Sequence, residues 1–115
     1  MTHATIDLAA FRDLQETAGA EFVRDLVRTF LEEAPGMFAD LRGAYGAGEA
    51  DRFRRAAHSL KSNGLSFGAV GFGAMARELE LAGLDKVRQG GEAALAALEA
   101  EFARVAAALE ELSHA

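Results

Sequence analysis

Towards its C-terminal end, the chain repeats large apolar residues at alternating steps of three and four. The residues of this series are Leu95, Leu98, Phe102, Val105, Leu109 and Leu112. The spacing places all of these side chains on one side of an α-helix, and that side needs a hydrophobic partner. Because the series is short and other amphipathic helices are available, it favours the inner face of a helix bundle over a coiled-coil dimer. We therefore expect a monomer.

Four further segments show helical spacing, and no segment alternates apolar and polar residues as a strand does. We expect a short helix after an N-cap at Asp7, and longer helices over residues 20–45, 49–66 and 72–90. Pro35 lies inside the first of the longer helices. Because the apolar period continues beyond this proline, we expect a kink and not a stop. The expected apolar side of this helix includes Phe22, Leu26, Phe30, Leu41 and Tyr45.

Long amphipathic helices that are joined by short turns pack beside antiparallel neighbours. The sequence therefore predicts an all-α fold, an antiparallel up-down four-helix bundle with a short extra N-terminal helix. A chain of 115 residues suits a single domain. We assign residues 1–115 to one domain, with its core over about residues 7–112.

The composition excludes several classes of protein. Half of the residues are hydrophobic and only one is proline, which is typical of a globular chain and not of a disordered one. Cysteine is absent, so there is no disulfide framework. No apolar run reaches the length of about 18 residues that a membrane span needs, and the first residues do not resemble a signal peptide. The net charge of −6 argues against general nucleic-acid binding. We expect a cytoplasmic protein.

His58 is the histidine that falls within a helical pattern away from the chain ends. If residues 50–65 form a helix, the apolar stripe consists of Phe53, Ala56, Ala57, Leu60 and Gly64. His58 then points away from this stripe into solvent. The residues that share its side of the helix are Arg54, Arg55, Lys61, Ser62 and Leu65. The pattern therefore predicts an exposed imidazole among cations and small residues.

Three roles for such an imidazole can be compared. A metal site needs further ligands at suitable spacing, and none lies near His58 in the sequence. A general base beside a nucleophile needs an oriented acidic partner, and no carboxylate lies within a helical turn of His58. The third role, in which the imidazole itself carries a phosphoryl group, suits the surroundings. Lys61 and Arg54 lie on adjacent turns, where their charge would stabilise the phosphoryl group.

The segment around His58 resembles the signature of histidine-containing phosphotransfer (HPt) domains of bacterial phosphorelays. The residues that match the signature are His58, Leu60, Lys61, Ser62, Gly68 and Ala69. The Leu79-Glu80 pair also lies where the family often has it, and residues 30–35 resemble part of the first long helix of the family. The resemblance covers roughly residues 7–112.

This resemblance implies a phosphorelay intermediate. Nε2 of His58 would accept a phosphoryl group from the aspartyl phosphate of one receiver domain and pass it to an aspartate of another, with Lys61 stabilising the group. The partners would be receiver domains of response regulators or hybrid histidine kinases. The receiver would bring Mg²⁺, and this chain would bind no cofactor or metal of its own. The chain has no nucleotide-binding motif, so we expect a phosphocarrier and not a free-standing enzyme.

The same reasoning assigns the residues that would contact a receiver. These expected docking residues are Arg54, Arg55, Ser62, Gly64 and Leu65. Two positions depart from the family pattern. Ser62 stands where the family often has glycine, and it is still small. Glu80 stands where some relatives carry glutamine, and a carboxylate beside the histidine would oppose the phosphoryl charge, so the role of Glu80 stays open.

Two alternatives remain at this stage. The phosphoacceptor domain of a histidine kinase also carries a histidine on a helical bundle, but that family usually has an acidic residue directly after the histidine and a proline soon after. Ser59 and the proline-free stretch that follows argue against it. A non-catalytic helical adaptor would bind a receiver without carrying phosphate. The sequence does not identify the donor and acceptor receivers, the signal or the direction of net phosphate flow. It also does not separate a stand-alone protein from an excised kinase domain.

Overall fold

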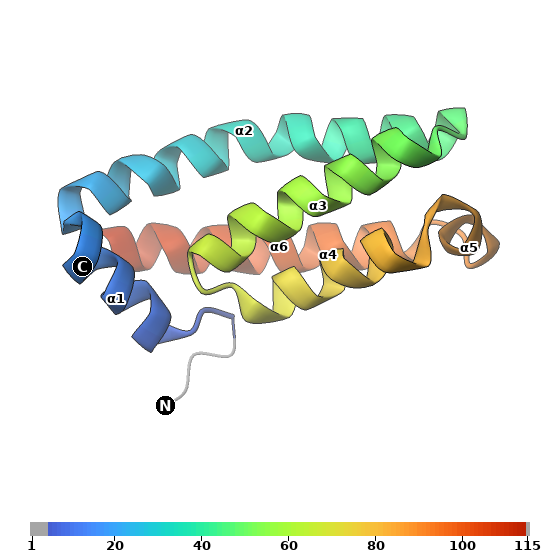
Figure 1. Cartoon of the computed structure of the whole chain (residues 1–115). Coiled ribbons are helices and arrows are strands. Elements are labelled where there is room, and N and C mark those ends of the chain that lie inside the picture. The colour runs from blue at the N-terminus through green and yellow to red at the C-terminus, as the bar shows by residue number, and fades with distance from the viewer. Residues whose placement is uncertain (1–4, 115) are drawn as a thin grey trace.

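The computed structural model describes residues 5–114, and these residues form α-helices and no strand. The helices are α1 (Leu8–Ala18), α2 (Ala20–Ala47), α3 (Ala50–Ser66), α4 (Val70–Ala82), α5 (Leu84–Gln89) and α6 (Ala93–Ser113). Helices α2, α3, α4 and α6 run alternately in opposite directions along a body of 41 × 26 × 19 Å, while α1 lies across one end and α5 at the other (Figure 1). The prediction of an all-α bundle with a short extra N-terminal helix is confirmed.

Helix α1 begins and ends where the sequence indicates. The side chain of Asp7 accepts a hydrogen bond from the backbone N–H of Ala10 at 3.2 Å, which is the geometry of an N-cap. Gly19 has a φ of 97°, a value that favours glycine, and it separates α1 from α2. Phe11 of α1 and Ile6 just before the helix are buried, so this N-terminal segment contributes to the core.

Helix α2 does not stop at Pro35, as expected, while the expected kink stays a prediction. Pro35 is exposed while Ala34 is buried, so the ring lies on the side where water can replace the missing backbone hydrogen bond. The placement of Phe22 on the buried side was wrong, because this side chain is 55% exposed. The buried residues of α2 are Val23, Val27, Phe30, Ala34, Phe38, Leu41 and Ala44. Their spacing turns Phe22 away from the bundle.

The prediction of one helix over residues 72–90 was also wrong. The chain breaks at Gly83, where φ is 83° and ψ is 163°, and this conformation divides the segment into α4 and α5. Leu84 and Val87 are buried on the far side of the break. The apolar spacing continues across Gly83, so the periodicity alone reads as one helix.

Aromatic side chains connect three of the four long helices in the core. Phe30 of α2 stacks on Phe67 at a centroid distance of 5.5 Å. Phe102 of α6 makes edge-to-face contacts with Phe30 and Phe38 at centroid distances of 5.7 and 5.3 Å, and it lies 6.0 Å from Phe72 of α4. Aromatic pairs at these separations are favourable beyond the area that they bury. The apolar series of α6 thus faces the bundle interior, as predicted.

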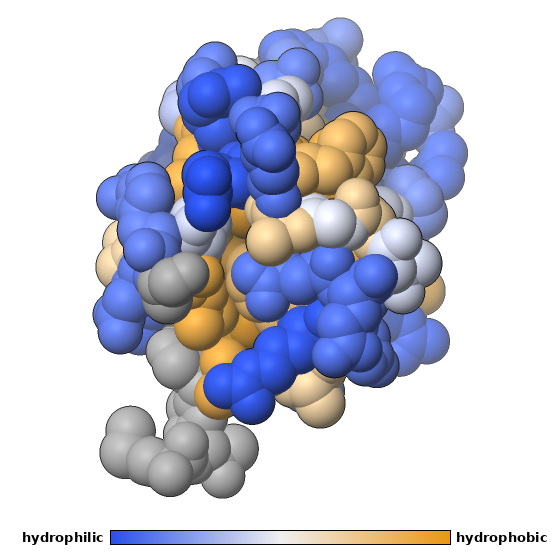
Figure 2. Space-filling view, turned by 90° about the vertical axis from the view of Figure 1, so that its left-hand side faces the viewer, coloured by the Kyte–Doolittle hydropathy of each residue, from blue (hydrophilic) through white to orange (hydrophobic). Residues whose placement is uncertain are grey.

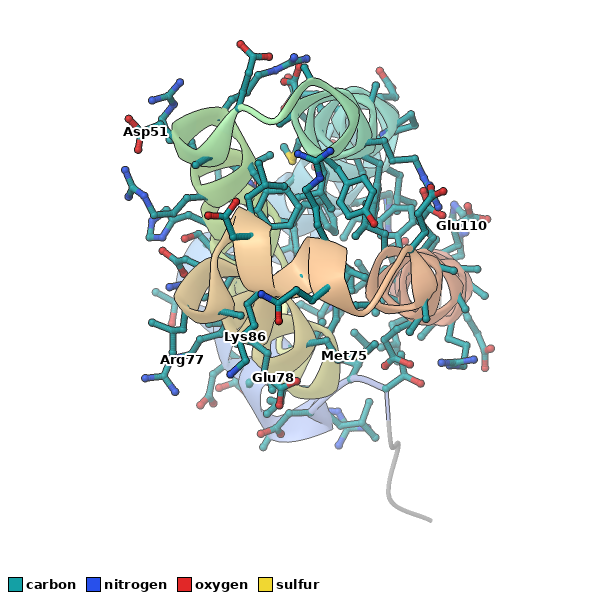
Figure 3. All side chains as sticks on the ribbon, turned by 90° about the vertical axis from the view of Figure 1, so that its right-hand side faces the viewer. Asp51, Met75, Arg77, Glu78, Lys86 and Glu110 are labelled. Atoms are coloured by element: carbon teal, nitrogen blue, oxygen red, sulfur yellow. The ribbon has the colours of Figure 1, made fainter. Side chains whose placement is uncertain are left out.

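The outer surface is mostly polar. The end of the bundle where α1 lies shows hydrophilic side chains with apolar areas between them (Figure 2). At the opposite end, the side chains of Arg77, Glu78 and Lys86 extend outwards from α4 and α5 (Figure 3). No helix within residues 5–114 is both long enough and apolar enough to cross a membrane.

Candidate phosphoacceptor site

His58 lies on the outward side of α3, and its side chain is 55% exposed. The opposite side of the helix is buried, through Phe53, Ala56, Ala57, Leu60 and Gly64. The apolar stripe expected from the sequence is therefore the observed one, and the expected exposure of His58 is confirmed. Because the ring lies outside the core, its chemistry does not depend on opening the bundle.

The side chain of Glu80, on α4, contacts both His58 and Lys61 of the motif. Its Oε2 lies 2.8 Å from Nδ1 of His58, and its Oε1 lies 2.8 Å from Nζ of Lys61. The side chains of Glu80 and Lys61 are only 15% and 19% exposed. The sequence placed no carboxylate within a helical turn of His58. The acid comes instead from the neighbouring helix, and the Leu79-Glu80 pair of the family pattern was the signal for it.

The contact with Glu80 selects one tautomer of the neutral imidazole. A carboxylate only accepts hydrogen bonds, so Nδ1 of His58 donates to Oε2 of Glu80. Nε2 then carries the free lone pair on the opposite edge of the ring. The hydroxyl Oγ of Ser62 lies 3.5 Å from Nε2, at the limit of hydrogen bonding. The site therefore presents a nitrogen nucleophile whose other nitrogen is held by an acid.

Glu80 stays ionised in this setting. The adjacent Lys61 ammonium holds the pKa of the Glu80 carboxyl below its usual range, burial opposes this shift, and the hydrogen bond with His58 adds to it. Lys61 is thus paired with Glu80 and is not a free cation beside the imidazole. Its expected role towards a phosphoryl group stays a prediction.

Two glycines allow α3 and α4 to approach closely enough for the Glu80 contacts. A Cβ atom on Gly64 would lie 2.6 Å from Cδ2 of Phe72, and one on Gly73 would lie 2.4 Å from Cδ2 of Leu65. Real Cβ atoms essentially never approach this closely. Gly64 is buried, so the structure gives it a packing role. This placement does not support its expected role as a docking residue.

The glycine and alanine of the motif also have a structural function. Gly68 has a φ of 83°, and its carbonyl accepts a hydrogen bond from the N–H of Asp7 at 2.8 Å. A Cβ on Gly68 would lie 2.9 Å from the carbonyl oxygen of Asp7, while Ala69 is buried. Both the backbone conformation and the close approach therefore require glycine at this position. The pair connects the turn between α3 and α4 to the start of α1.

The remaining docking residues expected from the sequence are spread over two sides of His58. Arg54 forms an ion pair with Asp51 at 3.5 Å, and Ser62 is exposed. Leu65 is 47% exposed and leans over Gly73 towards α4. Arg55 lies towards α2, where it lines an open groove of about 490 Å³. The other residues of this groove are Met37, Asp40, Arg52, Ala56 and Ser59.

Sequence reasoning missed two apolar residues on the outer side of α4. Val70 is 56% exposed and Leu81 is 69% exposed, although both are large hydrophobic residues. Leu81 directly follows Glu80 in the chain. Leu65 of α3 is a further large apolar residue that is exposed on these two helices, and exposed apolar residues are typical of protein contacts where they form a contiguous patch.

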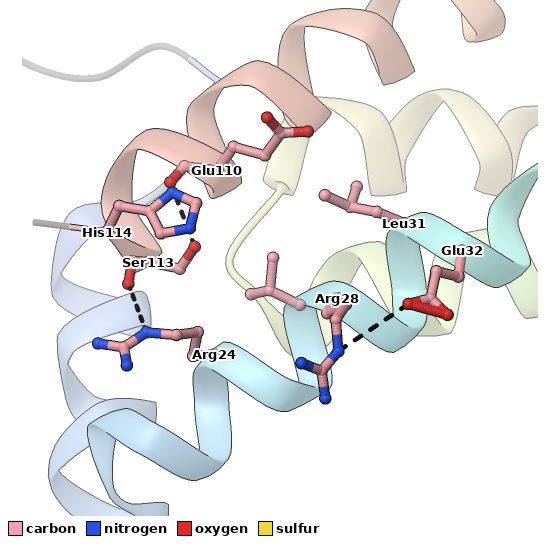
Figure 4. Close-up of a pocket in the computed structure, with 8 residues that line it drawn as sticks. Arg24, Arg28, Leu31, Glu32, Glu110, Ser113 and His114 are labelled. Atoms are coloured by element: carbon pink, nitrogen blue, oxygen red, sulfur yellow. Dashed lines mark hydrogen bonds and ion pairs between the residues drawn. The ribbon is translucent and has the colours of Figure 1, made fainter.

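A second cavity lies between α2 and α6 and not beside His58. Its volume is about 370 Å³, and the residues in view are Arg24, Arg28, Leu31, Glu32, Glu110, Ser113 and His114 (Figure 4). Nε of Arg24 donates to the carbonyl oxygen of Ser113 at 3.0 Å, which satisfies one of the last carbonyls of α6. Within residues 5–114, no group of three or more histidine and acidic side chains is arranged to hold a metal ion.

Comparison with known proteins places this geometry in a family. The model of the Hpt domain family matches residues 25–115, which include His58, Lys61 and Glu80. The structure is also similar to the crystal structure of histidine-containing phosphotransfer protein B (HptB) from Pseudomonas aeruginosa PAO1. The two chains are 29% identical, the TM-score is 0.78, and the match covers 96% of this chain and 95% of the other. The curated proteins gave no match. With the family model matching most of its length, this chain belongs to the Hpt domain family and has a histidine phosphotransfer role in a phosphorelay.

Proposed function

We propose that this protein is a phosphorelay intermediate that receives a phosphoryl group on Nε2 of His58 from the aspartyl phosphate of one receiver domain. It then transfers the group to an aspartate of another receiver. The observation that carries the proposal is the exposed imidazole whose Nδ1 is bonded to Glu80, since this contact leaves the Nε2 lone pair available. The family match and the likeness to HptB support the coarser role in phosphotransfer.

The transfer step follows from this geometry. The lone pair of Nε2 attacks phosphorus, an N–P bond forms, and the P–O bond to the receiver aspartate breaks with its electron pair left on the carboxylate. The second transfer repeats these events with an incoming aspartate oxygen and returns the electron pair to Nε2. Phosphoryl transfer depends chiefly on alignment and on stabilising charge. A fixed ring on a rigid helix supplies the alignment.

This protein and the receiver would each supply part of the charge that stabilises the phosphoryl group. Lys61 contacts the same carboxylate that holds the ring, and we assign it the stabilisation of the phosphoryl group from this side. The receiver would bring Mg²⁺ and the aspartate. Without a nucleotide-binding motif of its own, the chain would act as a phosphocarrier that depends on its partners and does not use ATP unaided.

The receiver would dock on the surface around His58, which we extend to the exposed apolar residues of α3 and α4 and from which we leave out the buried Gly64. We assign Arg54, Ser62 and Leu65 of α3 to this surface, together with Val70 and Leu81 of α4. Arg55 would contact a receiver that also reaches the groove towards α2. We expect the protein to act as a monomer in the cytoplasm.

A transfer assay tests the proposal. The protein is mixed with a panel of phosphorylated receiver domains and Mg²⁺, and acid-labile, base-stable phosphate is measured. His58→Gln is compared with His114→Gln, which removes a second exposed imidazole far along the chain. We expect label on the wild type and on His114→Gln, and none on His58→Gln.

The two alternatives predict different results. A receiver that binds equally well with and without His58, with no label on either protein, would indicate an adaptor. An obligate dimer in a solution mass measurement, together with no label from any receiver, would favour the phosphoacceptor domain of a histidine kinase.

A further inference from the structure

Glu80 contacts the nitrogen that the transfer step does not use, and this arrangement has a consequence for the phosphorylated state. We propose that Glu80 retains the proton on Nδ1 of His58 after Nε2 has been phosphorylated, so that the phosphohistidine stays in its readily transferred form. The inference rests on the proposed function, because it concerns the same imidazole. It adds a determinant of how fast, and over which pH range, the phosphoryl group leaves.

The chemistry of the leaving group explains why this proton matters. When the N–P bond breaks, its electron pair stays on Nε2. If Nδ1 is protonated, the group that leaves is a neutral imidazole, and the ring returns to the tautomer present before phosphorylation. If Nδ1 has lost its proton, the group that leaves is an imidazolate anion, which is a much poorer leaving group. A device that holds the Nδ1 proton therefore keeps the phosphoryl group transferable.

The contact geometry gives Glu80 this capacity. Its Oε2 lies 2.8 Å from Nδ1, and only 15% of its side chain is exposed, so the charge acts on the ring with little screening. A carboxylate that is hydrogen-bonded to a ring N–H favours the protonated ring. Because Lys61 lies 2.8 Å from the other oxygen, Glu80 remains a carboxylate when the ring gains positive character.

Several charged groups near α3 are engaged elsewhere, and Arg55 of α3 lines the groove towards α2. On α3, Arg54 is paired with Asp51, and Ser62 reaches only Nε2. From α2, Asp40 is paired with Arg52 at 3.1 Å. From α5, Arg88 lies over the ring of Tyr45. Among the described residues, the carboxylate that contacts Nδ1 is therefore that of Glu80 from α4.

The test loads His58 chemically and so needs no receiver. Phosphoramidate transfers its phosphoryl group to Nε2, its own P–N bond breaks, and its nitrogen leaves as ammonia after taking up a proton. In protein with ¹⁵N-labelled histidine, the phosphorylated ring is recognised by its coupling to phosphorus, and the Nδ1 resonance is followed against pH. The variant is Glu80→Gln. The matched control is Glu78→Gln, which removes the same charge from an exposed position on the same helix (Figure 3).

We expect Nδ1 of the wild type and of Glu78→Gln to lose its proton at a pH about one unit higher than in Glu80→Gln. The rate of hydrolysis of the phosphohistidine should shift along the pH axis by the same amount, which is up to a tenfold difference in the window between the midpoints. Coinciding midpoints in the wild type and Glu80→Gln would overturn the inference. If Glu80→Gln loses its helical circular dichroism, Glu80→Asp replaces it, because the shorter side chain keeps the charge but withdraws it from Nδ1.

The result separates this inference from the proposed function. Shifted midpoints with no exchange of phosphate with any receiver would support the role of Glu80 and count against the relay. Exchange of phosphate with receivers, together with unshifted midpoints, would support the relay and count against the role of Glu80.

Discussion

The close packing of α3 on α4 predicts that a single methyl group at position 64 destabilises the protein. In Gly64→Ala, the new Cβ would lie 2.6 Å from Cδ2 and 3.1 Å from Cε2 of Phe72, whereas ordinary contacts begin near 3.4 Å. Phe72 is fully buried and in contact with other aromatic rings, so it cannot move into solvent. Overpacking of this kind costs about 1–3 kcal/mol.

An opposing effect comes from helix propensity. Alanine is more favourable than glycine in a helix interior by about 1 kcal/mol. Taken with the steric cost, this leaves Gly64→Ala less stable than the wild type by about 1 kcal/mol. The same substitution at Gly36 is the control, because Gly36 lies in α2 and has no atom within 4 Å of a new Cβ. Gly36→Ala should be more stable than the wild type by about 0.5–1 kcal/mol.

Urea unfolding followed by circular dichroism measures both variants. A change of about 1 kcal/mol moves the midpoint by roughly 0.5 M, downwards for Gly64→Ala and upwards for Gly36→Ala. If Gly64→Ala is instead stabilised to the same degree as Gly36→Ala, helix propensity alone accounts for the change in stability. The argument that the approach of Phe72 requires glycine at position 64 is then refuted.

Three further predictions concern the charged residues. Lys61→Ala should slow phosphoryl transfer or shorten the lifetime of the phosphohistidine, and an unchanged rate and lifetime in the receiver assay would remove Lys61 from the mechanism. The lowered pKa of Glu80 means that its contribution to stability is present above its ordinary pKa near 4.5 and is lost as the pH falls through the lower folded value. Glu80→Gln should therefore show a weaker loss of melting temperature than the wild type between about pH 5 and pH 3. Arg42→Met removes contacts of 2.6 Å with both Glu99 and Glu92, and because these groups are more than a third exposed, the expected loss in urea unfolding is only about 1 kcal/mol.

Most of the fold could be predicted from the sequence because periodicity determines which side of each helix is buried. The apolar stripe of α3 and the inward series of α6 are as the spacing indicates. The break at Gly83 could not be read in this way, since Val87 lies eight residues after Leu79, which is a helical interval. The exposure of Phe22 was missed for a related reason. A wide apolar side shows that a helix has several neighbours, but it does not show where the buried strip ends.

The candidate site was also predictable from the sequence only in part. The exposure of His58 follows from its angle on α3, which the sequence contains. Its partner Glu80 lies 22 residues further along the chain, and the contact depends on how closely and in what register α3 and α4 pack. Gly64 and Gly73 permit this close packing, but a glycine in the sequence does not show which neighbour approaches it. The resemblance pointed to the Leu79-Glu80 pair, but only the structure assigned it a partner.

The hydrogen bond between Asp7 and Gly68 has a practical consequence for where this unit begins. The family model starts at residue 25, yet the chain that holds the motif glycine in position lies well before it. A protein trimmed to the matched region would lose this bond and would also uncover the core surface that Ile6 and Phe11 cover. The region that matches the family model is thus shorter than the region that packs together as one unit. Protein engineers who transplant this module into another chain should carry α1 and the residue that caps it.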